Sequence, residues 1–184
     1  MEREGIALRK TVLYIAVSLD GYIADQSGGV AWLNQLPTQE EDGYPEFIAQ
    51  VDTIIIGAAT YGQIVTELSP GEWPYQEQKT YVLTHQPGRA DEENHIIFTS
   101  CPPGHLVEQL KEQKGKNIWI CGGAQTARQF IRAGLVEEYR LTIAPVLLGK
   151  GIPLFEEDGP QKQLSLKKVI QRGPLVELIY SANI

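Results

Sequence analysis

The chain has 184 residues, of which 42% are hydrophobic and 21% are charged, and its formal net charge is -7. This length fits one compact domain with a hydrophobic core and is too short for two ordinary catalytic domains. The acidic balance, without a basic stripe, argues against nucleic acid as a partner, and no apolar run approaches the ~20 residues that cross a bilayer.

The beginning of the chain is charged, and no apolar stretch of the signal-peptide kind follows it. We therefore expect residues 1–10 to be a flexible leader, residues 11–184 to form a single domain, and the protein to be cytoplasmic. The two cysteines, Cys101 and Cys121, do not have the spacing of a metal site. In the absence of a secretion signal we expect two free thiols and no bound metal.

The first third of the chain contains one clear strand and one helix. An apolar, β-branched run over residues 11–17 predicts a buried strand that ends at the turn Ser18-Leu19-Asp20-Gly21. Residues 23–37 have the composition of a loop and contain Trp32, so we expect a loop that could cover a site. A helix is expected over residues 38–51, because a capping threonine and three acidic residues stand at its start.

The middle of the chain alternates between strand and helix. Residues 52–57 are almost purely aliphatic, which predicts a strand buried on both faces, and a helix is expected to begin near Ala59 or Thr60. Further strands are expected over residues 79–84, 96–98 and 117–121, and a further helix over residues 106–114. This alternation favours a largely parallel sheet covered by helices.

The last part of the chain lacks helices. After Gly134, three segments have the pattern of strands, over residues 138–146, 163–170 and 175–181. We therefore predict an α/β fold with a mostly parallel central sheet, flanking helices and antiparallel C-terminal strands.

Two predicted strands run through glycine into a helix, at Gly57-Ala58-Ala59-Thr60 and at Cys121-Gly122-Gly123-Ala124. Glycine permits close approach of a ligand, and the first turn of a helix offers unpaired N–H groups, so each turn could bind phosphate. Alternatively, the small residues only let each helix pack on the sheet. Neither turn has the spaced glycines of a Rossmann fingerprint or the lysine of a Walker loop. The pair favours a dinucleotide, whose diphosphate would lie at the carboxyl ends of the strands.

Five short motifs follow one another along the chain. They are Ala16-Val17-Ser18-Leu19-Asp20-Gly21, Gly57-x-x-Thr60-Tyr61, Val82-Leu83-Thr84-His85, Gly122-Gly123 and Pro145-Val146-Leu147-Leu148-Gly149-Lys150-Gly151. In this order and spacing they resemble the dihydrofolate-reductase-like superfamily over residues 11–181. The nearest branch is the reductase domain of bacterial riboflavin biosynthesis, which is the C-terminal domain of a deaminase-reductase, together with its single-domain relatives.

This resemblance implies a dihydrofolate-reductase-like fold and an NADPH-dependent reductase, with NADH as the alternative cofactor. It implies hydride transfer to a small heterocycle, riboflavin-precursor-like or pterin-like, or to a related C=N or C=O substrate. A protein that keeps the fold and binds a nucleotide without catalysis is the alternative.

The resemblance places the cofactor at the ends of four strands. The implied cofactor-binding residues are Ala16, Gly57, Ala59, Thr60, Leu83, Thr84, His85, Cys121, Gly122, Gly123, Ala124, Gln125 and Thr126. Many relatives carry a basic residue directly after the first glycine, whereas Ala58 has no charge, so backbone N–H groups and the Thr60 hydroxyl would bind there. Thr84 and His85, with Arg89 near them in sequence, would favour the 2′-phosphate of NADPH.

The turn that contains Asp20 lies by the active site in relatives, so Asp20 is the implied catalytic residue, which would bind an N–H group of the heterocycle or donate a proton. Asp20 could equally bond its own turn. The acidic group Glu40, Glu41 and Asp42 is the alternative source of a proton.

Three residues are implied to contact the substrate, namely Trp32, Tyr44 and Thr142. The two aromatic residues could instead be core side chains. Residues 145–155 resemble the family's long final hairpin region, which implies a homodimer.

Overall fold

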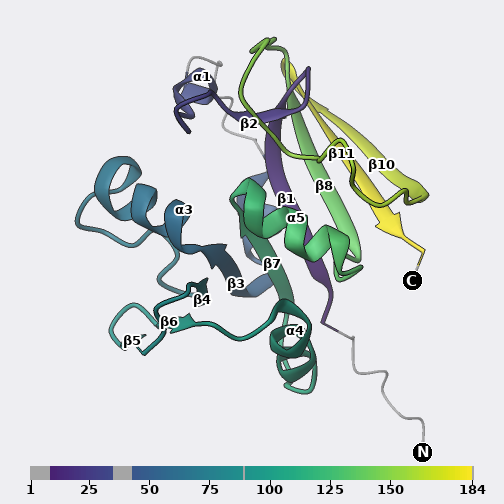
Figure 1. Cartoon of the computed structure of the whole chain (residues 1–184). Helices are drawn as coiled ribbons and strands as arrows, with labels where there is room; N and C mark the ends of the chain where they lie inside the picture. The colour runs from purple at the N-terminus through teal and green to yellow at the C-terminus, as the bar shows by residue number, and fades with distance from the viewer. Residues whose placement is uncertain (1–8, 35–42, 89, 184) are drawn as a thin grey trace, which may run out of the picture.

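The computed structural model describes residues 9–34, 43–88 and 90–183, and Figure 1 shows how they are arranged. The acidic group Glu40, Glu41 and Asp42 lies outside the described residues, as do Arg89 and most of the expected leader.

A mixed sheet of nine strands forms the centre of the described part of the chain, in the order β10-β11-β8-β1-β7-β3-β4-β6-β5 (Figure 1). Its strands are β1 (Thr11–Ser18), β3 (Val51–Gly57), β4 (Lys79–Leu83), β5 (Ala90–Asp91), β6 (Ile96–Thr99), β7 (Asn117–Gly122), β8 (Glu138–Ala144), β10 (Leu164–Arg172) and β11 (Leu175–Ala182). From β8 to β6 all neighbours are parallel, whereas β11 is antiparallel to both β8 and β10. The predicted fold class is confirmed, and β8 joins its two parts, since it is parallel to β1 and antiparallel to β11.

Helices connect the parallel strands. They are α1 (Ala31–Asn34), α2 (Tyr44–Ile48), α3 (Ala58–Gln63), which continues as a π-helical turn over Ile64–Leu68, α4 (Pro103–Lys111) and α5 (Ala124–Arg132). The expectation of a helix that reaches Val51 is wrong, because Val51 starts β3 and pairs with Asn117 of β7. At this position, pairing of the β-branched run in the sheet is more favourable than continuation of the helix. Within the described residues, no helix is long and apolar enough to cross a membrane.

An apolar layer lies on each face of the sheet. The face covered by α4 and α5, here called the α5 face, contains Leu13, Ile55 and Ile120. The opposite face, here called the α2 face, is covered by α2 and by the segment that follows α3. Successive residues of a strand point to opposite faces, so Ile54, Ile55 and Ile56, each 0% exposed, fill both layers. This confirms the strand buried on both faces, and each such side chain contributes about 1.5–3 kcal/mol of transfer free energy.

A small second sheet joins two loops above the ends of β1 and β8. Its strands are β2 (Tyr22–Ala24) and β9 (Ile152–Pro153), which pair antiparallel. The Leu154 N–H also donates to the Gly21 carbonyl at 3.0 Å. Residues 145–155 therefore fold back onto the turn after β1, and the long C-terminal hairpin is formed by β10 and β11 instead.

Candidate functional site

The two glycine turns lie side by side at one edge of the sheet. Strands β3 and β7 are parallel neighbours, and Ile56 pairs with Gly122 at their carboxyl ends. Each strand then continues directly into a helix, α3 after Gly57 and α5 after Gly123. Ligands of open α/β sheets collect at this kind of edge.

Side chains from each helix reach into the other turn. The Thr60 hydroxyl of α3 accepts a hydrogen bond from the Gly123 N–H at 2.8 Å. A Cβ atom on Gly123 would stand 2.8 Å from Thr60 Oγ1, and one on Gly57 would stand 2.5 Å from Thr126 Oγ1 of α5. The two turns are thus interlocked, and this close packing requires glycine at both positions.

The amides at the start of α3 and α5 indicate that this edge of the sheet could bind an anion. No side chain caps the N-terminus of either helix, and the first N–H groups of a helix have no partner within it. The Gly123 N–H is already taken by Thr60, so the amides of Ala124, Gln125 and Thr126 are the donors at α5. Neither turn carries a cation, as expected from Ala58. Backbone dipoles therefore dominate the local field.

The end of β4 extends this edge. Leu83 lies opposite Gly57 in the sheet, so Thr84 and His85 emerge beside the first glycine turn. The Thr84 hydroxyl accepts a hydrogen bond from the Gln86 N–H at 3.1 Å, while the His85 side chain is exposed. The structure thus brings the residues expected around the nucleotide to one edge.

The α2 face holds the other predicted residues. Ala16 of β1 pairs with Thr142 of β8, and Thr142 pairs with Glu177 of β11, so the three side chains share a face. Tyr44, at the start of α2, contacts Trp119 of the same face with 6.2 Å between ring centroids. The structure therefore brings Ala16, Tyr44 and Thr142 to one side of the sheet.

Trp32 stands apart from this group. It lies in α1, is 8% exposed, and its indole nitrogen has no hydrogen-bond partner among the described residues. No described contact joins it to Tyr44 or Thr142, so its role as a substrate wall stays a prediction.

Sequence reasoning missed a buried ion pair beside Thr142. Arg140 Nη2 lies 2.7 Å from Glu177 Oε1, and Arg172 adds a second cation 3.8 Å from Glu177 Oε2. The Arg140 guanidinium also lies over the rings of Tyr14, at 5.6 Å, and Phe47, at 5.2 Å. A carboxylate that is 2% exposed needs such partners. The sequences of β8 and β11 gave no signal for this pairing, because Arg140 and Glu177 are far apart in the chain.

A second missed group lies at the end of β7. The Tyr75 hydroxyl is hydrogen bonded to the Cys121 thiol. Tyr44 lies close enough to Tyr75 to raise the pKa of the Tyr75 hydroxyl. Burial raises the pKa of Cys121 to about 12, which the hydrogen bond from Tyr75 partly opposes. The thiol is therefore protonated at neutral pH. Both cysteines are free thiols.

Asp20 has a well-defined set of partners. Its carboxylate accepts hydrogen bonds from Ser18 Oγ at 2.6 Å, from the Gly149 N–H at 2.7 Å and from the Leu148 N–H at 3.2 Å. These bonds, that from Ser18 first, lower the pKa of Asp20 below its ordinary value. An ionised carboxylate with this pKa is a poor proton donor at neutral pH. The geometry favours a structural role, in which Asp20 ties the turn after β1 to the loop after β8.

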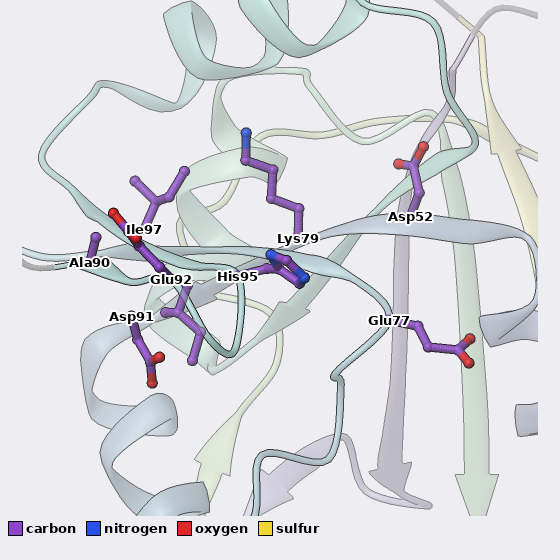
Figure 2. Close-up of a pocket in the computed structure, with 9 residues that line it drawn as sticks. Asp52, Glu77, Lys79, Ala90, Asp91, Glu92, His95 and Ile97 are labelled. Atoms are coloured by element: carbon purple, nitrogen blue, oxygen red, sulfur yellow. The ribbon is translucent and has the colours of Figure 1, made fainter.

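A cavity of about 490 Å³ opens at the opposite end of the strands (Figure 2). It is lined by Asp52 at the start of β3, Lys79 at the start of β4, Glu77, and residues 90–92 and 95–97. Asp52 is already paired with Arg9 and accepts the Lys116 N–H at 2.7 Å, while Asp91 accepts the Asn94 side-chain amide at 2.8 Å. The described part of the chain offers no cluster of three metal-ligating side chains there or elsewhere.

Comparison with known proteins shows the family of the chain, independently of the geometry of the site. The family model described as the RibD C-terminal domain matches residues 9–178. The uncharacterized protein YwjB of Bacillus subtilis is 42% identical over 172 residues, which cover 94% of this chain and 97% of YwjB.

Two solved structures have the same fold. A putative riboflavin biosynthesis protein from Shewanella sp. PV-4 superposes with a TM-score of 0.84 at 25% identity, covering 95% of this chain and 99% of that one. A diaminohydroxyphosphoribosylaminopyrimidine deaminase/5-amino-6-(5-phosphoribosylamino)uracil reductase from Thermotoga maritima superposes with a TM-score of 0.68 at 15% identity, covering 95% of this chain and 57% of that one. At this identity the second likeness concerns the fold alone.

Proposed function

We propose, from the premise that this chain belongs to the RibD C-terminal domain family, that it is an NADPH-dependent reductase of a small heterocycle or a related C=N or C=O substrate. The observation that carries the proposal is the pair of interlocked glycine turns at neighbouring strand ends. A single such turn would serve packing alone, whereas two turns give two uncapped helix N-termini at one edge. A diphosphate could accept hydrogen bonds from both sets of donors.

The residues at the edge fit a dinucleotide. The amides of Ala124, Gln125 and Thr126 would bind one phosphate group and those of Ala59 and Thr60 the other. Thr84 and His85 would lie beside the adenosine ribose, where the hydroxyl and the imidazole would donate hydrogen bonds to a 2′-phosphate and so favour NADPH over NADH. When bound, the reduced nicotinamide supplies a hydride. The protein aligns the two reacting carbon atoms and excludes water.

The α2 face would hold the substrate. Tyr44 would contribute an aromatic ring there, packed edge-on against the buried Trp119, and Thr142 of the same face would add a hydroxyl. Aromatic walls with a few polar groups suit a planar heterocycle. The Shewanella sp. PV-4 protein, which is 25% identical to this chain, is named a putative riboflavin biosynthesis protein, which supports a heterocyclic substrate.

A nucleotide-binding protein without catalysis is the second candidate, and the lack of a cation in either glycine turn favours it. Titration with NADPH, followed by nicotinamide fluorescence, tests both candidates. Binding below 1 mM followed by oxidation of NADPH with a heterocyclic acceptor supports the reductase. Binding without oxidation across aminouracil and dihydropterin acceptors supports the second candidate, and an absence of binding refutes both.

We also propose that the protein is a homodimer. Leu147 follows β8 and Phe155 follows β9; their side chains are 72% and 49% exposed, and they would lie in the contact between the two copies. Light scattering after size exclusion tests this proposal: a mass of two chains supports it, and a mass of one chain at micromolar concentration refutes it.

A further inference from the structure

Tyr75 occupies a defined place on the α2 face. It belongs to the segment between the π-helical turn and β4, and its ring lies between two tryptophans. Its ring centroid is 5.2 Å from that of Trp73 and 5.3 Å from that of Trp119, both in edge-on contact. Two such contacts hold the ring in one orientation.

The hydroxyl of Tyr75 points toward the second glycine turn. Trp119 and Cys121 are alternate residues of β7 and therefore share a face of the sheet. Since the Tyr75 ring contacts Trp119 and its hydroxyl is hydrogen bonded to Cys121, the side chain runs along β7 toward its carboxyl end. Gly122 and Gly123 follow directly. The hydroxyl thus stands where the substrate side of the α2 face meets the proposed cofactor edge.

The hydroxyl keeps its proton at this place. Burial, with the neighbouring Cys121 and Tyr44 groups, raises the pKa of Tyr75 above its ordinary value. Its partner sulfur is a weak acceptor, so a stronger acceptor on a ligand can replace it. Asp20 does not compete as a donor, because the hydrogen bond from Ser18 lowers its pKa.

We propose that Tyr75 is the proton donor of the reduction, an assignment that rests on the proposed function. As the hydride forms the new C–H bond, the π electron pair of the C=N or C=O bond moves to the heteroatom. The Tyr75 O–H bond breaks and a new N–H or O–H bond forms there. The phenolate then takes a proton from water, so each turnover consumes one hydride and one solvent proton. A nitrogen or oxygen anion formed in this way is basic enough to accept a phenolic proton.

Two measurements test the proposal, with Tyr75→Phe as the variant and Tyr81→Phe as the matched control. Tyr81 packs on the α5 face and plays no part in the site. The first measurement follows the rate at which a small thiol reagent labels Cys121 in a Cys101→Ser background. We expect NADP⁺ to slow labelling at least ~10-fold, and 2′,5′-ADP, which lacks the nicotinamide, to leave the rate unchanged. Bound NADP⁺ that leaves labelling unchanged overturns the proposal.

The second measurement uses NADPH oxidation with aminouracil and dihydropterin acceptors. Loss of a general acid costs roughly 10²–10⁴-fold in rate, so Tyr75→Phe should lower kcat at least ~100-fold. KM and the NADPH dissociation constant should stay within threefold, and the solvent isotope effect on kcat should change. Turnover by Tyr75→Phe within threefold of wild type overturns the assignment to Tyr75 and leaves the reductase proposal intact. A wild-type protein that binds no NADPH, or that reduces none of these acceptors, refutes both.

Discussion

The interlock between the glycine turns predicts a specific pattern of rescue. In Gly57→Ala, the new Cβ atom would stand 2.5 Å from Thr126 Oγ1, while the next nearest atom, Thr126 Cβ, is at 3.7 Å. The first contact is a severe overlap and the second is ordinary van der Waals contact. Removing the hydroxyl with Thr126→Ala should therefore relieve the strain that Gly57→Ala introduces.

The magnitude follows from the cost of overpacking. Inserting one methyl group into a packed site costs about 1–3 kcal/mol, and in a domain of this size each kcal/mol lowers Tm by roughly 2–4 °C. We expect Gly57→Ala to lower Tm by about 2–12 °C and to weaken NADPH binding ~10-fold, since a displaced turn misplaces its amides. The double variant should recover most of both losses.

Calorimetry and NADPH fluorescence on the four proteins of this double-mutant cycle measure the coupling. The account requires a favourable coupling free energy of about 1 kcal/mol or more. Gly104→Ala is the control, because no atom lies within 4 Å of its added Cβ. Strictly additive effects of Gly57→Ala and Thr126→Ala would show that the two turns are not interlocked as described.

Three further predictions concern charged and titratable groups. Glu177→Ala should lower the free energy of unfolding by about 3–5 kcal/mol, since it leaves Arg140 buried without its carboxylate. Urea denaturation measures this loss, with Glu157→Ala, at an exposed position, as the control. A loss below 1 kcal/mol would contradict the stabilising role of the ion pair. Asp20→Asn should lower Tm at pH 7. The folded-state pKa of Asp20 is lowered, so the ionised carboxylate contributes to stability above its unfolded pKa near 3.8, and this contribution disappears as the pH falls through the folded-state pKa. Thermal melts between pH 2 and 7 should therefore converge for the two proteins at low pH, and a constant difference would argue against the hydrogen-bonded carboxylate. The rate of Cys121 alkylation should rise about tenfold per pH unit up to its pKa of about 12, and a plateau near pH 9 would contradict the buried thiol.

Most of the fold was predictable because its signals are local. The aliphatic run of β3 and the glycine after it stand together in the sequence, and burial of Ile54, Ile55 and Ile56 on both faces follows from composition alone. The end of α2 was not predictable, because Val51 pairs with Asn117 of β7 and no local sequence pattern encodes this pairing. The two-residue strand β9 likewise exists only through its pairing with β2.

The site divides in the same way. The glycine turns were recognisable from the sequence, and their interlock through Thr60 and Thr126 followed only from the structure. Asp20 was recognisable as part of the turn after β1, but its hydrogen bonds come from amides 128 and 129 residues away, in the loop after β8. Tyr75 carried no motif, and its importance comes from the place where its hydroxyl meets Cys121.

The central claim is that the glycine edge binds the dinucleotide. A crystal structure of the protein with NADP⁺ tests this most directly. We predict the diphosphate between the N-termini of α3 and α5, with the amides of Ala124 and Thr126 within hydrogen-bonding distance and the nicotinamide beside Cys121. NADP⁺ bound elsewhere, such as in the cavity lined by Asp52 and Lys79, would contradict the account.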